Sequence, residues 1–245
     1  MSAHPLRAQS RTEVVLTLRR GESVLLTLGI PVALLVFFSI ADVFPTPDRF
    51  DHAVDFLFPG VLALAVMSAA MVGPAIATGF EREYGVLKRL AVTPLGRPSL
   101  IAAKTAGILV VEVVQVGILT VVAVLLGWGS TGTRPLVALG AVLLGTIAFA
   151  GLGLLLGGTL PGLTTLAAAN GLYVLLLLVG GMLFPLSSLP GWLQGASRAL
   201  PPASLADLLH GALEPHGHAP LRAWLVLGAW AVAGPALASR WFRWT

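Results

Sequence analysis

The chain has 245 residues, of which 56% are hydrophobic and only 11% are charged, with a mean hydropathy of +0.90. Soluble globular domains carry about one quarter charged residues, so this composition excludes an ordinary soluble domain and indicates a membrane protein. The chain contains no cysteine, which excludes disulfides and thiolate metal sites. Its formal net charge of +4 has to be read by position, because basic residues gather on the cytoplasmic side of membrane proteins.

Six apolar stretches are long enough to cross a membrane, which takes about 20 mostly apolar residues for roughly 30 Å of hydrocarbon. They lie at residues 23–43, 56–79, 100–128, 136–160, 164–184 and 221–239. Only Pro161 and Gly162 separate the fourth stretch from the fifth, which predicts a tight helical hairpin. We therefore expect an all-α, polytopic fold with six transmembrane helices in a single transmembrane domain, residues 1–245.

The basic residues are distributed unevenly between the two sides of these stretches. Eleven of the 15 Lys and Arg residues lie before the first stretch, between the second stretch and the beginning of the third (up to Lys104), or after the last. By the positive-inside rule these three segments face the cytoplasm. The sequence thus predicts a multi-pass protein of the plasma (inner) membrane with both termini in the cytoplasm.

Residues 10–22 come before the first apolar stretch and place Val14, Val15 and Leu18 on one helical face. This pattern suits a short interfacial helix that lies along the inner membrane surface with its arginines at the lipid headgroups. A basic flank that only sets the topology explains the same residues equally well, and both interpretations stay open.

A polar interruption at residues 80–98 separates the second and third stretches. It begins with EREYG, and a Thr-Pro pair breaks it at residues 93 and 94. Up to Val92 it can form a short amphipathic helix with Tyr84, Leu87 and either Leu90 or Ala91 on one side. Its charges have both signs, which suits a mixed-charge protein socket better than anionic lipid alone. We expect another protein to push on the membrane bundle through this loop.

Two spans, the motif E-R-E-x-G-x-L-x-R-L-x-V-T-P-L and a third span follow one another in this sequence. This order resembles the permease subunits of ABC type-2 exporters, which move drugs, antibiotics and polysaccharides out of cells. In that family the loop is a coupling helix that docks into a groove of the ATPase subunit. The resemblance implies an ATPase-coupling role for Glu81, Arg82, Glu83, Tyr84, Gly85, Leu87, Lys88, Arg89, Leu90, Thr93 and Pro94.

A second block, GGMLFPLSSLPGWL from Gly180 onwards, resembles the segment that follows span five in the same family. The surrounding segment, residues 185–220, is too apolar for a solvated loop and contains several prolines. Two short helices that dip partway into the outer leaflet, as a re-entrant hairpin, would explain both facts. A small folded loop packed on the bundle is the alternative. We expect Phe184, Pro185, Leu189, Pro190 and Trp192 to form an outer gate.

Three of the polar residues inside the apolar stretches are candidates for a role in transport: Glu112 and Gln115 in the third and Asn170 in the fifth. Glu112 and Gln115 are three residues apart, so we expect them to face the same way. Polar side chains inside a membrane are costly and usually face the protein interior. All three residues either line the translocation path or make hydrogen bonds to neighbouring helices.

The sequence contains none of the usual enzyme motifs. It has no G-x-x-x-x-G-K-[ST] phosphate loop, no H-E-x-x-H and no G-x-S-x-G. His210, His216 and His218 have no carboxylate or cysteine at a characteristic spacing, so we expect no metal site. The chain is therefore not expected to be an enzyme, to bind a cofactor itself, or to bind nucleic acid.

The resemblance implies that a separate ABC ATPase subunit supplies the energy and holds ATP and Mg. The expected partners are that ATPase, a second copy of the permease or a paralogue, and the lipid bilayer. The expected function is export of a lipophilic or amphiphilic substrate: a drug, antibiotic, lipid or glycan. Two alternatives remain, an ion-driven secondary transporter and a membrane anchor or sensor that transports nothing.

Overall fold

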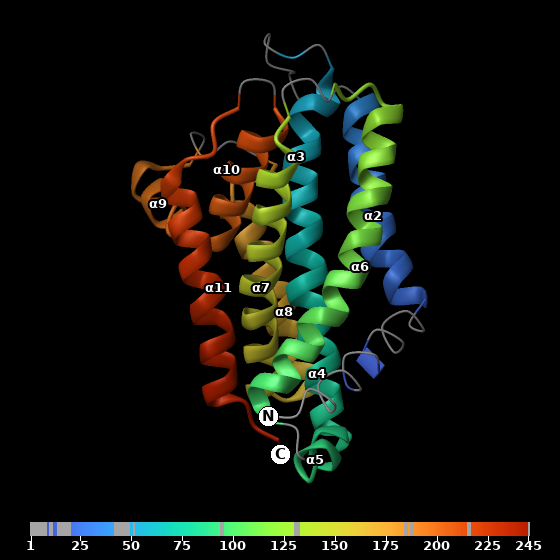
Figure 1. Cartoon of the computed structure of the whole chain (residues 1–245), viewed down its shortest axis with the longest axis vertical. Helices are drawn as coiled ribbons and strands as arrows, with labels where there is room; N and C mark the ends of the chain where they lie inside the picture. Colours follow the sequence, from blue (N-terminus) through green and yellow to red (C-terminus); the bar gives the residue numbers. More distant parts are fainter. Residues whose placement is uncertain are drawn as a thin grey trace.

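The computed structural model describes residues 9, 12–13, 21–41, 50, 52–93, 96–129, 133–183, 186, 189–214 and 217–244, and only the backbone of residues 21–26. These residues form a bundle of helices, and none of them lies in a β-strand (Figure 1). The prediction of an all-α fold is confirmed for this part of the chain. Of the predicted interfacial helix at residues 10–22, only Thr12, Glu13, Gly21 and Glu22 are described.

The helices are labelled as in Figure 1. In chain order they are α2 (Gly21–Ile40), α3 (Ala53–Met67), the π-helical segment η1 (Ser68–Val72), α4 (Gly73–Glu83), α5 (Val86–Ala91), α6 (Arg97–Leu125), α7 (Pro135–Thr159), α8 (Gly162–Val179), α9 (Gly191–Ser197), α10 (Pro201–Leu213) and α11 (Leu221–Trp241). Helices α7 and α8 are joined through Leu160 and Pro161, which confirms the predicted tight hairpin.

Five helices within the described residues are long and apolar enough to cross a membrane: the continuous helix α3–η1–α4, α6, α7, α8 and α11. The apolar part of α2, Thr27–Ile40, is shorter than these five helices. The fold is that of a multi-pass membrane protein, and the span expected at residues 23–43 stays a prediction.

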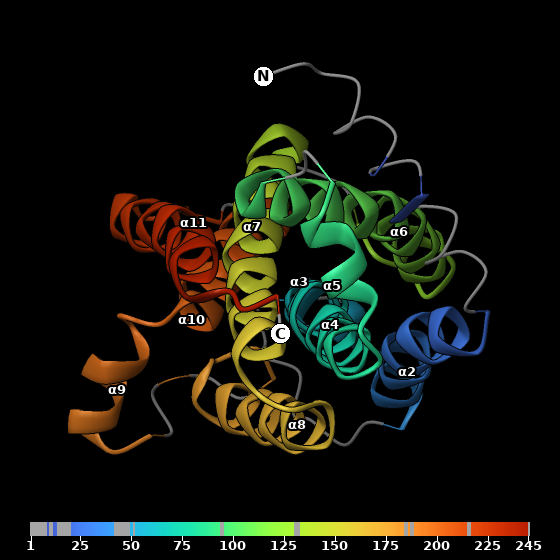
Figure 2. The same cartoon turned by 90° about the horizontal axis from the view of Figure 1, so that it is seen from below.

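Helix α7 and the continuous helix α3–η1–α4 lie at the centre of the bundle, and α2, α6, α8 and α11 surround them (Figure 2). Glycines on α7 allow this close packing. A Cβ atom at Gly153 would lie 2.4 Å from the carbonyl oxygen of Met71, and one at Gly157 would lie 2.5 Å from that of Ala75. Only a residue without a side chain permits the two backbones to approach this closely.

The central helix contains a π-helical turn, Ser68–Val72, directly before Gly73 and Pro74. Proline has no backbone N–H, so Pro74 cannot close the ordinary helical hydrogen bond to the residue four positions earlier. The wider π turn accommodates this missing bond without ending the helix. The continuous helix therefore runs from Ala53 to Glu83, the length of the bundle (Figure 1).

We call the end of the bundle that holds α5 the α5 end, and the opposite end, which holds α9 and α10, the far end (Figure 1). The two short helices predicted within residues 185–220 are present as α9 and α10. Leu205, Leu208 and Leu209 of α10 are fully buried against the bundle, whereas α9 lies at its edge (Figure 2). Whether this pair dips into the outer leaflet stays a prediction.

Candidate functional site

The charged loop between the second and third spans is divided by a sharp turn. Helix α4 ends at Glu83, the chain turns at Tyr84 and Gly85, and α5 begins at Val86. Gly85 has a φ of 72°, in the left-handed region that glycine adopts without steric cost. The predicted single amphipathic helix up to Val92 is therefore wrong, because the membrane helix continues to Glu83 and the chain bends at Gly85.

One side of α5 is attached to the bundle. Leu87 is fully buried in a cluster with Leu100, from the first turn of α6, and Phe242, from the segment after α11. Leu90 and Trp244 pack against the same cluster. These contacts join the loop to the beginning of one spanning helix and the end of another.

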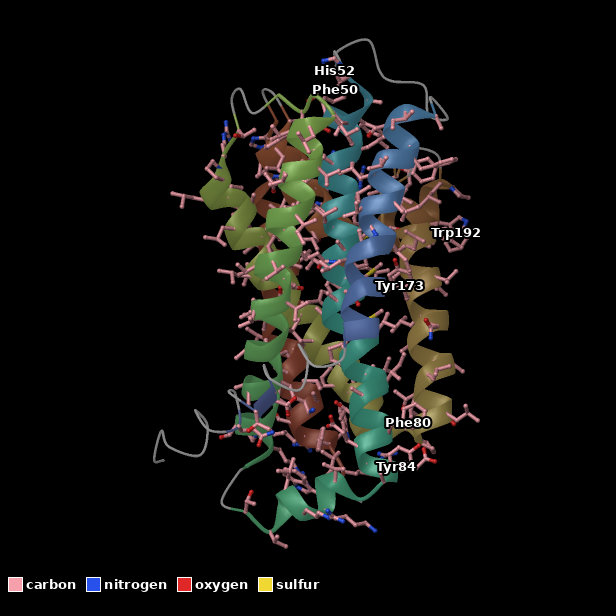
Figure 3. The ribbon with its side chains drawn as sticks, turned by 90° about the vertical axis from the view of Figure 1, so that its right-hand side faces the viewer. Phe50, His52, Phe80, Tyr84, Tyr173 and Trp192 are labelled. Atoms are coloured by element: carbon pink, nitrogen blue, oxygen red, sulfur yellow. The ribbon has the colours of Figure 1, made fainter. Side chains whose placement is uncertain are left out.

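The other side of α5 is exposed. Together with the exposed end of α4, its side chains combine both signs of charge with apolar surface. We call them the α5 surface: Glu83 and Tyr84 at the end of α4, and Val86, Lys88, Arg89 and Val92. Tyr84 was expected on the same side of the helix as Leu87, but Leu87 is fully buried whereas Tyr84 is 73% exposed. The turn at Gly85 separates it from α5, and its ring stacks on that of Phe80 of α4 with centroids 6.0 Å apart (Figure 3).

The end of the loop is partly described. The Thr93 hydroxyl donates to the carbonyl oxygen of Leu90 at 2.6 Å, directly after α5 ends at Ala91. Such a bond satisfies a carbonyl that the helix itself leaves without a partner. Pro94, the last residue assigned to coupling, lies outside the described residues.

Two basic residues beside α5 face the bundle. Arg82 Nη1 donates to the carbonyl oxygen of Gly158, near the end of α7, at 3.0 Å, and the backbone N–H of Arg243 donates to the same oxygen at 2.9 Å. Lys104 Nζ lies 2.7 Å from Glu81 Oε2 and 3.3 Å from Glu13 Oε1. We call Lys104, Glu81 and Glu13 the Lys104 cluster.

The Lys104 cluster ties the N-terminal segment to α4 and α6, and Lys104 is only 6% exposed. The sequence analysis missed it as a site. A lysine in the second turn of an otherwise apolar helix was the available signal, since a buried charge needs a partner. The partner Glu13 is 91 residues away in the chain, so the sequence could not name it.

Inside the bundle, Glu112 and Gln115 are both 1% exposed but contact different helices. The Thr146 hydroxyl of α7 donates to Glu112 Oε2, and Gln115 Nε2 donates to the carbonyl oxygen of Thr27 in α2 at 2.8 Å. The predicted hydrogen bonds to neighbouring helices are therefore present. Both side chains are buried, as residues on one side of α6 can be, and their partners belong to the two different helices α2 and α7.

Asn170 differs from these two residues. It is exposed on α8, and its side chain donates to the carbonyl oxygen of Leu166 in the same helix at 2.8 Å. The predicted bond to a neighbouring helix is wrong for Asn170, because this face of α8 points away from the rest of the chain.

The residues expected to form an outer gate lie at the far end. Pro190 and Trp192 are exposed, Trp192 to 77%, and Leu189 is half-buried. Trp192 lies at the edge of the bundle near α8 (Figure 3). Phe184 and Pro185 lie outside the described residues. The structure therefore places Trp192 at the periphery of the chain, and its role as a gate stays a prediction.

The far end holds a polar pocket of about 520 Å³, which the sequence analysis did not identify; it is lined by α10, by the segment after α8 and by residues up to Arg222 at the start of α11. Its charged lining includes Arg198, Asp207, Glu214 and Arg222. Burial raises the pKa of Asp207, and the nearby Arg222, His210 and Arg198 oppose this shift. No group of three metal-ligating side chains occurs among the residues that the structure describes.

Comparison with known proteins identifies relatives over most of the chain. Residues 7–213 match the protein family described as "ABC-2 type transporter". The chain is also 26% identical, over 204 residues, to a protein of Bacillus subtilis (strain 168) named "Putative transport permease YvfS". That alignment covers 80% of this chain and 80% of the relative.

Proposed function

Because the chain belongs to the ABC-2 type transporter family, we propose that it is the membrane subunit of an ATP-driven exporter. Two copies, or one copy and a paralogue, enclose the path of a lipophilic or amphiphilic substrate across the plasma membrane. A separate ABC ATPase subunit binds ATP and Mg on the cytoplasmic side. The α5 end faces that subunit, so both termini are cytoplasmic, as the basic residues suggest.

The two-sided environment of α5 carries this proposal. A helix that transmits force must be attached to the spanning helices on one side and open to a partner on the other. Leu87 is buried against Leu100 and Phe242, whereas Lys88 and Arg89, the next two residues, are exposed. Charged side chains of both signs would fix the position of a partner on this surface. The exposed apolar side chains among them would add contact area.

Movement of α5 would be transmitted to several spanning helices at once. Helix α4 follows α3 in one continuous helix, Leu100 belongs to α6, and Arg82 holds the end of α7 through Gly158. A push on α5 would therefore tilt the central helix together with α6 and the α7–α8 hairpin. The ATPase can shift the permease between two states only if its contacts with α5 differ between them.

Charge reversal on the α5 surface tests the proposal. The permease is co-expressed with a candidate ABC ATPase and purified through a tag on the permease. Lys88→Glu and Arg89→Glu should each reduce recovery of the ATPase about tenfold or more, because charges at the centre of an interface are replaced by repelling ones. Arg134→Glu is the matched control, since Arg134 is exposed at the far end. Equal recovery with all three variants would contradict the proposal.

Export assays in cells separate this function from the two alternatives. For an ATP-driven exporter, ATP depletion should stop export and Arg89→Glu should reduce it. Export that an uncoupler stops but ATP depletion leaves unchanged would identify an ion-driven transporter instead. An ATPase that co-purifies with a chain that exports no compound would identify a membrane anchor.

A further inference from the structure

A pocket of about 340 Å³ lies between α3, α6 and α7, within the range typical of small-molecule sites. Its walls are almost entirely apolar. Val113 of α6 and Leu139 and Leu143 of α7 line it and are also exposed on the outside of the bundle, Val113 to 73%. Outside a multi-pass membrane protein at this depth are lipid chains. The pocket is therefore open sideways, towards the lipid.

One acidic side chain forms part of this apolar wall. Glu112 lines the pocket and is 1% exposed. Its Oε2 accepts a hydrogen bond from Thr146, and its Oε1 has no hydrogen-bond partner among the described residues. Leaving a buried carboxylate oxygen without a donor is costly, more so in hydrocarbon than near water. A ligand that brings a donor would remove this cost.

The two ends of the pocket differ chemically. Glu112 lies near the middle of α6, and Trp128 lines the pocket beyond the end of that helix. The Trp128 ring packs edge-on against that of Phe58, which also lines the pocket, with centroids 4.8 Å apart. A flat apolar ligand body can pack on such an aromatic pair. The pocket thus offers a carboxylate and an aromatic surface within one apolar enclosure.

We propose that this pocket binds lipophilic amines that enter from the membrane. The apolar body of the ligand fills the space beside Phe58 and Trp128, and its protonated amine donates to Glu112 Oε1. A cationic donor suits this position best, because hydrogen bonds between charged groups are about twice as strong as neutral ones. The inference rests on the proposed function to the extent that such an amine would be a transported substrate.

Binding of two matched probes to the purified full-length permease in lipid nanodiscs tests the inference. The probes are 1-pyrenemethylamine, which is cationic at neutral pH, and 1-pyrenemethanol, which has the same ring system and no charge. Energy transfer from tryptophan to pyrene reports binding. The amine should bind about tenfold or more tightly than the alcohol, because only the amine supplies a charged donor to Glu112. Trp128→Phe should lower the transfer signal more than substitution of any of the other five tryptophans, since Trp128 lines the pocket.

Glu112→Gln should bring the affinity for the amine to within about twofold of that for the alcohol, with the alcohol unchanged. Val113→Trp gives a second measurement that leaves Glu112 in place, since a larger side chain at the mouth should weaken binding of both probes. Val114→Trp is its control, because Val114 is exposed on the same helix but does not line the pocket. Equal binding of both probes by the wild type, or a preference for the amine that survives Glu112→Gln, would overturn the inference.

The binding assay uses the permease without its ATPase, so its result is independent of the co-purification experiment. If the ATPase co-purifies but the amine is not preferred, the inference about the pocket is wrong and the proposed function stands. If the amine is preferred but no ABC ATPase associates, the proposed function is wrong and the binding site stands.

Discussion

Helix α6 carries two buried ionisable side chains, Lys104 and Glu112, which are eight residues apart and have opposite surroundings. Lys104, near the α5 end, has carboxylates from Glu81 and Glu13 within ion-pair distance. Glu112, in the middle of the bundle, has one neutral donor, Thr146, and one oxygen with no described partner. Because the partners of Lys104 belong to the chain itself, its charge contributes to the stability of the fold. A buried carboxyl group with an oxygen that has no described partner is suited to a ligand that binds and leaves.

The strongest test of this difference is Lys104→Met, which keeps the length of the side chain but removes its charge. The substitution removes the ion pairs of Lys104 with Glu81 and Glu13, at 2.7 and 3.3 Å. Breaking a buried ion pair by removing one partner typically costs about 3 to 5 kcal/mol. We therefore expect the free energy of unfolding of the detergent-solubilised protein to fall by about that amount, measured by denaturant titration.

Lys88→Met is the matched control for this substitution. Lys88 is exposed on α5, so the same chemical change there should alter the free energy of unfolding by less than about 0.5 kcal/mol. Similar losses for the two variants would mean that the Lys104 cluster adds nothing to stability.

Glu112→Leu should not lower the free energy of unfolding, in contrast to Lys104→Met. It removes a buried carboxylate with an unpaired oxygen, and the Thr146 hydroxyl keeps its second bond, to the carbonyl oxygen of Val142 at 2.8 Å. No polar group is orphaned, so we expect the free energy of unfolding to stay constant or rise by about 1 to 3 kcal/mol. The same titration measures it. A loss comparable to that of Lys104→Met would show that Glu112 is structural.

Thr146→Val should change the free energy of unfolding by a smaller amount, and it tests only the hydrogen bond from Thr146 to Glu112. It leaves the carboxylate without any described donor, which should cost about 1 kcal/mol in the wild-type protein. In the Glu112→Leu background the same substitution should cost almost nothing, because the acceptor is gone. A double-mutant cycle of these two positions measures the coupling, and additive effects would contradict the assigned bond.

The sequence predicted the spanning helices well, because the length of an apolar run is a local property. The sixth stretch was expected at residues 221–239, and α11 runs from Leu221 to Trp241. The fourth was expected at residues 136–160, and α7 runs from Pro135 to Thr159. Hydrocarbon thickness sets such lengths without reference to the rest of the chain.

The chemistry between the helices was less predictable. The charges from Glu81 to Arg89 continue an amphipathic pattern across Gly85, so the pattern alone does not reveal the turn there. The Lys104 cluster and the pocket depend on side chains brought together from distant segments, such as Phe58, Glu112 and Leu139. Pattern analysis identified Glu112 as unusual, but only the packed structure shows that one of its oxygens accepts from Thr146 and the other has no donor among the described residues.

A further ion pair lies at the far end, and its two side chains are partly exposed, unlike Lys104 and Glu112. Arg222 Nη2 lies 2.9 Å from Asp207 Oδ2, and the two side chains are 43% and 32% exposed. Pairs in contact with solvent contribute about 0.2 to 1 kcal/mol. Arg222→Ala should therefore reduce the free energy of unfolding by no more than that at neutral pH, far less than Lys104→Met.

The pH dependence of the same variant shows whether Asp207 is the partner. Burial raises the pKa of Asp207 and Arg222 opposes this, so Arg222→Ala should raise that pKa further. A raised pKa means that the folded state binds the proton more tightly than the unfolded chain does. The stabilisation that protonation of Asp207 provides is therefore present at acidic pH and is lost as the pH rises through the folded-state pKa. Arg222→Ala should thus lose more stability at neutral pH than at acidic pH, where Asp207 is protonated with or without Arg222. Equal losses in denaturant titrations at both pH values would mean that Arg222 stabilises the far end through its bond to the carbonyl oxygen of Arg198 instead.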